Sequence, residues 1–283
     1  VHQEAVVVMA YWQADAPAAA GHVAALTAAI FVAKVSAGQL LYVAGVRDST
    51  RAGARLADLV GYNMVAASVS CMFGYLGVVG IVTDWAALNA SLNAYMSGRT
   101  ESTYQLGILM LAYQLANVLI SFRIADICTP AFLLHHLAAA ALAYFSVFHN
   151  AIPGGNHFYF GISETTNVLL AIVDIGKHWV KAREAAPVFF TAVRYLFAGA
   201  FMVVRVGIWT TLSWPFWRNA IEWVQNGSAA AAPADGTTYV VVGAFMAGNV
   251  FLSGLQYYWA AMIARIFVNV VTGRGTKSED KYE

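Results

Sequence analysis

Long apolar runs are spread over the whole chain, and they limit what it can fold into more than any other feature. A helix that crosses a bilayer needs about 20 mostly apolar residues. Seven windows meet this requirement: residues 22–46, 59–83, 104–122, 129–148, 158–176, 188–214 and 238–271. Only 11% of the 283 residues are charged, whereas soluble domains carry about a quarter. We therefore predict an all-α, polytopic integral membrane protein, a helical bundle with about seven transmembrane helices.

The positions of Lys and Arg predict the orientation, because positively charged loops favour the cytosolic side. If the windows alternate in direction, eleven Lys and Arg residues fall in loops on one side and two on the other. We predict a single transmembrane domain over residues 22–271. Residues 1–21 then form an N-terminal segment on the non-cytosolic side, and residues 272–283 form a polar cytosolic tail.

The two N-x-S/T sequons, at Asn89 and Asn226, both fall on the predicted outer side. Such sequons are glycosylation candidates in proteins of the secretory pathway. The sequence therefore favours the endoplasmic reticulum or another secretory membrane, with a mitochondrial or plastid membrane as the alternative. A formal net charge of +1 offers no basic surface to nucleic acid. The expected partners are membrane lipids and, in one interpretation, other membrane subunits.

Ionisable side chains lie inside several windows, where each costs about 3 kcal/mol and needs a partner or a function. Lys34 lies in the first window. If the fifth window is an α-helix, which turns by about 100° per residue, several of its polar residues fall on one stripe. We expect this stripe to face the bundle interior, and its members are His157, Glu164, Asn167, Asp174 and His178. Arg194 and Arg205 share a face of the sixth window, so the acidic and basic residues are expected to pair. Such pairs either form a functional cluster or only fix the register of two helices.

His135 and His136 are adjacent in the fourth window. Neighbouring side chains on a helix diverge by about 100°, so the two are poorly placed to bind one metal ion, and we predict no metal site. One histidine beside a carboxylate such as Glu164 is suited to acid–base chemistry. A core histidine that only satisfies hydrogen bonds is an equal alternative.

Four motifs follow one another from the fourth window onward. Residues 126–136 read Asp-Ile-Cys-Thr-Pro-Ala-Phe-Leu-Leu-His-His, and residues 161–167 read Gly-Ile-Ser-Glu-Thr-Thr-Asn. Residues 201–205 read Phe-Met-Val-Val-Arg, and residues 255–259 read Leu-Gln-Tyr-Tyr-Trp. In this order they resemble the double-histidine helix and three later segments of the TLC family. That family is named for translocating-chain-associating proteins, ceramide synthases and a related cargo receptor of the endoplasmic reticulum.

The resemblance implies a membrane protein that binds, senses or modifies a sphingolipid, fatty-acyl lipid or phospholipid in a cavity between the fourth, fifth and sixth spans. If the chain is an enzyme, it implies acyl transfer with His135, His136 and Glu164 as catalytic candidates. It implies no cofactor beyond acyl-CoA or a bound lipid. Ceramide synthases carry His-Asp and Ser-Asp pairs after the double histidine, and this chain keeps one such carboxylate, Glu164. It is thus more similar to the TLC-domain-containing branch linked to membrane-lipid composition.

Three other interpretations stay open. The same scaffold would serve as a non-catalytic structural subunit of a larger organellar membrane complex. Seven spans and a lysine at the end of the fifth, Lys177, are also compatible with a retinal protein. Microbial retinal proteins, however, carry the Schiff-base lysine in the last span. Buried charge pairs also line transporter pathways, although no internal repeat supports a transporter here.

Overall fold

The computed structural model of the chain describes residues 2–50, 55–226 and 236–272. In these ranges, seven helical spans are long and apolar enough to cross a membrane: Ala16–Val43, Leu56–Thr83, Leu92–Ser121, Pro130–His149, His157–His178, Pro187–Gln225 and Tyr239–Asn269. The predicted fold class, an all-α bundle with seven transmembrane spans, is therefore confirmed. The chain is an integral membrane protein.

The helices follow one another as α1 (His2–Val43), α2 (Leu56–Thr83), α3 (Trp85–Leu88), α4 (Leu92–Ser97), α5 (Glu101–Ser121), α6 (Pro130–His149), α7 (Thr166–His178), α8 (Val180–Ala185), α9 (Pro187–Ala200), α10 (Trp209–Asn226) and α11 (Gly236–Val271). Two spans change helix type along their length. The fifth span begins with the π-helix η3 (His157–Gly161) and the 3-10 helix η4 (Ile162–Thr165), which lead into α7. In the sixth span the π-helix η5 (Phe201–Ile208) joins α9 to α10. The 3-10 turns η1 (Ala125–Ile127) and η2 (Pro153–Gly155) lie in the connections.

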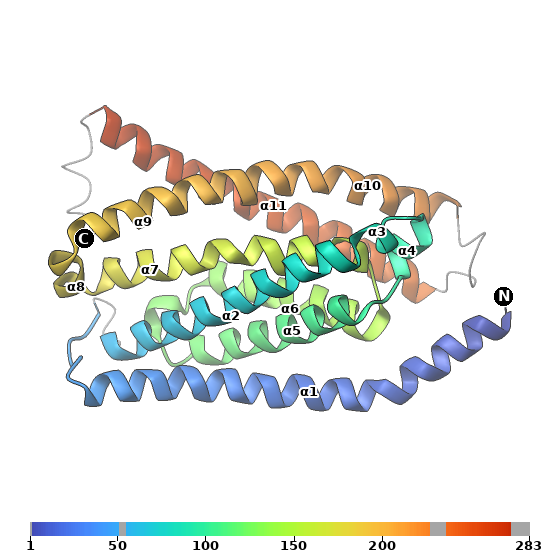
Figure 1. Ribbon diagram of the computed structural model, residues 1–283, viewed down its shortest axis with the longest axis horizontal. Helices are drawn as coiled ribbons and strands as arrows, with labels where there is room; N and C mark the ends of the chain where they lie inside the picture. The colour runs from blue at the N-terminus through green and yellow to red at the C-terminus, as the bar shows by residue number, and fades with distance from the viewer. Residues whose placement is uncertain (1, 51–54, 227–235, 273–283) are drawn as a thin grey trace.

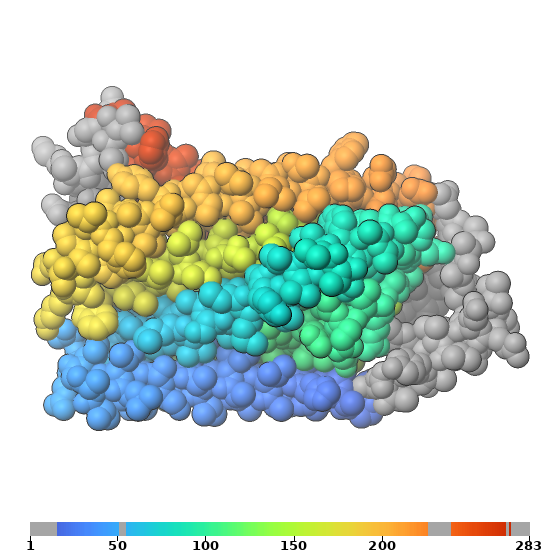
Figure 2. Space-filling model, in the orientation of Figure 1, coloured from blue at the N-terminus to red at the C-terminus, as the bar shows by residue number. Residues whose placement is uncertain are grey.

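The spans lie side by side in one bundle (Figure 1). On the face in Figure 2, α1, α2, α7 and α9 follow one another as adjacent bands. The third span, which contains α5, is the central one, since 72% of its most apolar window is buried compared with 11% for the sixth span. The start of α1 and the end of α11 lie at opposite ends of the bundle (Figure 1), as an odd number of spans requires.

The sixth span is longer than predicted. It extends to Gln225, whereas the sequence suggested an end near Trp214 and a loop from Pro215 onward. Pro215 removes one backbone hydrogen bond from α10 without ending the helix. Phe216 and Ala220 beyond it are buried, so packing against the bundle stabilises the helical continuation.

Polar contacts join the loops at each end of the bundle. At the end that carries most of the loop Lys and Arg residues, Lys181 Nζ lies 2.9 Å from Asp48 Oδ2. At the other end, the backbone N–H of Ile152 donates a hydrogen bond to the backbone oxygen of Met96 at 2.8 Å. These contacts place successive loops at alternate ends, as the orientation argument requires.

The helix α2 approaches the start of the fifth span so closely that only glycine fits at the contact. A Cβ atom added to Gly77 would lie 2.8 Å from the backbone oxygen of His157 and 2.9 Å from Cα of Gly161. Both are backbone atoms, so no side-chain rotation would relieve the clash. Next to this crossing, the imidazole of His157 packs against Gly80. The glycines therefore fix where the polar part of the fifth span enters the bundle.

Candidate functional site

The fifth span is not a uniform α-helix, and this decides where its polar residues point. The π-helical and 3-10 turns of η3 and η4 rotate by different angles per residue than an α-helix. The structure divides the predicted residues among three groups along the span. His157 lies at one end of the bundle, Glu164 and Asn167 lie near Arg205, and Asp174 and His178 lie toward the basic end.

Glu164 and Arg205 form a buried ion pair, as the spacing of acidic and basic residues suggested. Arg205 Nη2 lies 2.9 Å from Glu164 Oε1 and donates to Asn167 Oδ1 at 3.2 Å. Asn167 Nδ2 donates to the second carboxylate oxygen of Glu164 at 2.7 Å, and Arg205 Nε donates to Thr166 Oγ1 at 3.0 Å. Both side chains are less than a tenth exposed. The two charges cancel each other inside the bundle, where an unpaired charge would be strongly unfavourable.

The second suggested pairing, between Asp174 and Arg194, is absent from the described residues. Arg194 lies on an exposed side of α9, and none of the ion pairs in those ranges includes it. The π-helix η5 begins between Arg194 and Arg205, and its wider turns rotate less per residue than α-helical turns. The two arginines therefore do not share the face expected of them.

The adjacent histidines have different surroundings, and His136 lies inside a hydrogen-bond network. Its Nδ1 is hydrogen-bonded to Oε1 of Gln114 and lies 3.4 Å from Nδ2 of Asn117. A carbonyl oxygen only accepts, so in this orientation of Gln114 the proton of His136 is on Nδ1. Asn117 in turn accepts a hydrogen bond from Lys34 Nζ. The hydrogen bond from His136 to Gln114 therefore joins α6 to α5, and the hydrogen bond from Lys34 to Asn117 joins α1 to α5.

Lys34 is among the most deeply buried large side chains of the described chain, with 1% exposure. Its Nζ lies 4.1 Å from the ring centroid of Tyr62 and 4.8 Å from that of Tyr113. Aromatic faces attract a cation at this range. Within the described ranges no carboxylate forms an ion pair with Lys34, so the aromatic rings and Asn117 are the groups that stabilise its head.

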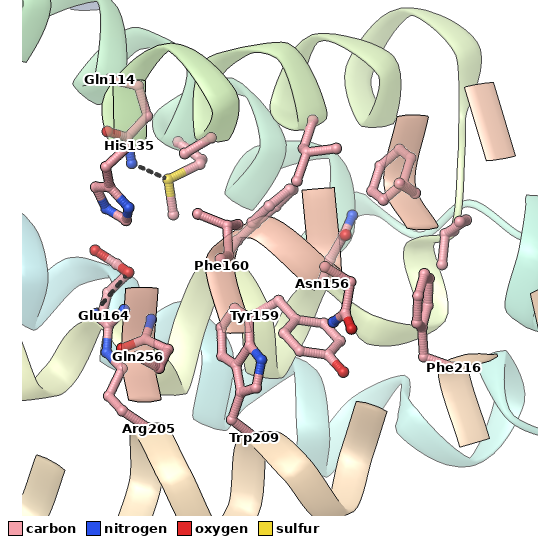
Figure 3. A pocket seen from close by; sticks show the side chains of 17 residues that line it. Gln114, His135, Asn156, Tyr159, Phe160, Glu164, Arg205, Trp209, Phe216 and Gln256 are labelled. Carbon is pink, nitrogen blue, oxygen red and sulfur yellow. Dashed lines mark hydrogen bonds and ion pairs between the residues drawn. The ribbon is translucent and has the colours of Figure 1, made fainter. Parts of the chain in front are cut away.

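His135 faces a pocket. Its ring packs against Trp259 of α11 with 5.6 Å between ring centroids, and its Nδ1 is buried without a hydrogen-bond partner in the described part of the chain. Figure 3 shows His135 and Glu164 pointing toward each other from two sides of this pocket. His135, and not His136, is therefore the histidine that shares the pocket with Glu164.

The pocket has a polar end and an apolar body. It contains about 670 Å³ of empty space, including the space at its opening. One end is lined by Gln114, His135, Glu164, Arg205 and Gln256 (Figure 3). The body is lined mainly by apolar and aromatic side chains: Met110, Ala139, Leu142, Ile152, Phe160, Trp209, Phe216, Phe245 and Leu252. Two more polar residues, Asn156 and Tyr159, lie toward the far end (Figure 3). A third, Asn249, lies near Tyr159, because both contact the hydroxyl of Ser213.

Three uncharged polar residues around the two histidines were not predicted as site residues, although one of them, Gln256, lies in the motif at residues 255–259. Gln114 and Gln256 line the pocket, and Asn117 lies beside His136 and accepts a hydrogen bond from Lys34. These three residues are neither ionisable nor part of the polar stripe of the fifth span, the two features from which the site residues are predicted. A carboxamide inside an apolar window also needs a hydrogen-bond partner in the bilayer core. A pattern that included carboxamides would therefore have indicated Gln114, Asn117 and Gln256.

His157 belongs to a separate polar cluster at the end of the bundle opposite the basic loops. Ser102 Oγ donates to Asp84 and lies 2.7 Å from Nε2 of His157. Burial by itself raises the pKa of Asp84, because it favours the neutral acid. The hydrogen bonds of the carboxylate and the charge of His157 outweigh burial, so the pKa is lowered. The hydrogen-bond partners are Ser102, Thr100 and Thr83. The cluster joins the end of α2 to the start of α5 and of the fifth span.

The lowered pKa of Asp84 predicts a loss of stability in acid. A carboxyl group whose pKa is lower in the folded protein stabilises it fully above the ordinary value of 3.8, and this contribution disappears as the pH falls through the lowered pKa. Asp84→Asn removes this titration. Between about pH 5 and about pH 3, we expect the Tm in detergent to fall less for this variant than for the wild type. Ser102→Ala should make the loss smaller, because without this hydrogen bond the folded-state pKa of Asp84 lies closer to its ordinary value. Equal pH profiles for all three proteins would contradict the assignment.

Two further sequence-based candidates lie away from the pocket. Asn89 is exposed at the end of α3, and its Nδ2 donates to the backbone oxygen of Trp85 at 2.9 Å. The sequon at Asn226 continues into residues 227–235, which lie outside the described residues. As for metals, the described ranges bring together no group of three or more His, Cys, Asp or Glu residues that could hold an ion.

Fold and site together define a seven-span integral membrane protein with a buried ion pair beside an intramembrane pocket. A family model described as the TLC domain matches residues 59–265, most of the chain. The chain therefore belongs to the TLC-domain family, which links it to the metabolism or sensing of membrane lipids. Searches of curated proteins and of solved structures found no match. The match begins in α2, so α1 and Lys34 lie outside it.

Proposed function

We propose that the chain binds a membrane lipid in the pocket beside Glu164 and senses or modifies it there. The observation that carries the proposal is the position of the Glu164–Arg205 pair and His135 at one end of a pocket with mostly apolar walls. A lipid has the same division between a polar head group and apolar chains, and ligand pockets commonly combine apolar walls with a few polar groups that orient the ligand. Membership of the TLC family supports a lipid over another apolar ligand.

We propose that the chain is more similar to the TLC-domain-containing branch than to the ceramide synthases, and the pairing of Glu164 is the argument for it. Amide formation needs a base that takes a proton from the amine while its nitrogen attacks an acyl thioester and the thiol leaves. Glu164 is held by Arg205 and Asn167, so it acts as a positioning group. For any acyl-transfer step we assign the acid–base role to His135, with acyl-CoA or a bound lipid as the acyl donor and His136 as structural support.

Native mass spectrometry of the purified protein tests lipid binding. We expect a bound lipid on the wild type and the loss of most of it in Arg205→Gln, because that change leaves Glu164 unpaired at the polar end. Arg194→Gln makes the same change at an exposed position of the same span and should keep the lipid. Both variants are first checked for monodisperse elution.

A lipid-free wild type, or equal lipid occupancy in the two arginine variants, would count against binding in this pocket. If the wild type is lipid-free and co-migrates stoichiometrically with other membrane proteins, the role of a non-catalytic subunit of a larger complex is favoured instead. Glu164→Gln, which keeps the size of the side chain, gives an independent comparison.

We place the protein in the endoplasmic reticulum or another secretory membrane, since Asn89 is exposed at the end of the bundle opposite the basic loops (Figure 1). Expressed in eukaryotic cells, the protein should show a glycosidase-sensitive shift in electrophoretic mobility, and Asn89→Gln should reduce this shift. Asn93→Gln, four residues on and outside any sequon, is the matched control. A protein that carries no glycan at Asn89 or Asn226 would favour a mitochondrial or plastid membrane.

A further inference from the structure

Two side chains that line the pocket leave buried polar atoms without a hydrogen-bond partner in the described part of the chain. These atoms are Oε1 of Gln256 and Nδ1 of His135. Gln256 is only 1% exposed, so bulk water does not reach it. Buried polar groups in proteins almost always have a partner, and leaving one unpaired is costly. The two side chains therefore indicate where a ligand would bind.

The charged groups of the pocket and the carboxamide at its far end are already paired. Glu164 and Arg205 bind each other at 2.9 Å. Asn249 Oδ1 accepts a hydrogen bond from Trp217 Nε1 at 3.0 Å, and Asn249 Nδ2 donates to Ser213 Oγ at 3.2 Å. The hydrogen-bonding capacity that remains is concentrated at the end where His135 and Gln256 lie.

From these two side chains we infer that the pocket takes a lipid whose head group is uncharged and both donates and accepts hydrogen bonds, as a hydroxyl or an amide does. The unpaired atom of Gln256 is its side-chain oxygen, which accepts hydrogen bonds and so needs a donor, whereas Nδ1 of a neutral imidazole donates in one tautomer and accepts in the other. A hydroxyl or an amide can donate to Gln256 and pair with His135 in either tautomer. The inference rests on the proposed function, because it names the head group of the lipid that the pocket would hold.

An anionic head group fits this end of the pocket poorly. A phosphate or a carboxylate only accepts hydrogen bonds, so the side-chain oxygen of Gln256 would stay unpaired. The anion would also lie beside the carboxylate of Glu164, and the cation that could offset the repulsion, Arg205, is already paired with that carboxylate. The ion pair therefore positions the site without acting as an anion receptor.

Four probes with the same monounsaturated chain separate the head groups: oleyl alcohol, oleamide, oleyl methyl ether and oleyl phosphate. Native mass spectrometry of the full chain in detergent measures the affinity of each. We expect the alcohol and the amide to bind at least about tenfold more tightly than the other two. The ether accepts but does not donate, and the phosphate is charged.

Gln256→Leu removes both hydrogen-bonding groups and nearly keeps the side-chain volume. It should weaken binding of the alcohol and the amide about tenfold and leave binding of the ether unchanged. Gln105→Leu, the same change at an exposed position of α5, is the control and should alter no affinity.

A preference for the phosphate, or equal affinities for the alcohol and the ether, would overturn the head-group assignment and leave lipid binding standing. Failure of all four probes would also overturn the assignment, and a protein that carries no co-purified lipid would overturn the proposed function with it. Binding of the alcohol without the amide supports a hydroxyl head group, and the reverse supports an amide.

Discussion

Arg205→Met should lower the free energy of unfolding by about 3–5 kcal/mol, because removing one partner of a buried ion pair leaves the other charge uncompensated. In this bundle the unpaired group would be the carboxylate of Glu164, which would keep only the hydrogen bond from Asn167. Thr166 would also lose the hydrogen bond that it accepts from Arg205. Denaturant titration of the protein in detergent micelles measures the loss.

Two comparisons make this result specific to the ion pair. Arg194→Met is the same substitution on the exposed side of the same span, and surface changes of this kind usually stay within about 0.5 kcal/mol. Combining Arg205→Met with Glu164→Gln removes the unpaired charge as well, so the double variant should recover a large part of the lost stability. Equal losses for the two single arginine variants would show that the pair is not the source of the effect.

The number of spans and the principal ion pair could be predicted from the sequence because both depend on properties that packing hardly changes. The need for about 20 apolar residues per span is an average over a long window, so local errors cancel. Glu164 and Arg205 are charges in apolar surroundings, and each has to find an opposite charge in the bundle interior. The structure brings them to 2.9 Å.

The direction in which each polar side chain points could not be predicted in the same way. A stripe drawn with α-helical rotation fails where the backbone becomes π-helical or 3-10, as it does from His157 to Thr165 and from Phe201 to Ile208. The first of these irregular stretches lies where Gly161 meets Gly77 of α2. That contact joins residues far apart in the chain, so no local pattern reports it. The prediction that Arg194 shares a face with Arg205 was wrong for the same reason, because part of the π-helix η5 lies between them.

The network behind the histidines extends the site beyond the family-matched residues. His136 donates a hydrogen bond to Gln114, a pocket residue, and Asn117, which accepts a hydrogen bond from Lys34 of α1, lies beside the same histidine. The helix α1 is therefore in contact with the residues that support the pocket wall. The ring of His136 also lies 5.1 Å from that of His135, so the network supports both polar residues on this wall of the pocket.

Gly77→Ala is expected to destabilise the protein by about 1–3 kcal/mol, the usual effect of forcing extra volume into a packed contact. The added methyl group would meet the backbone of His157 and Gly161 at less than 3.0 Å, so the fifth span would have to move as a unit. Such a shift would also displace Glu164, and we expect weaker lipid binding together with the lower Tm.

The matched control for this change, Gly254→Ala, is expected to raise the thermal unfolding temperature and not to lower it. Gly254 lies on an exposed part of α11, where an added Cβ meets nothing within 4 Å. Alanine is favoured over glycine inside a helix by up to about 1 kcal/mol, so Gly254→Ala should raise the thermal unfolding temperature slightly. If Gly77→Ala also raised the unfolding temperature, α2 and the fifth span could move apart to accommodate the added methyl group. The glycine contact would then not be what positions Glu164 at the pocket.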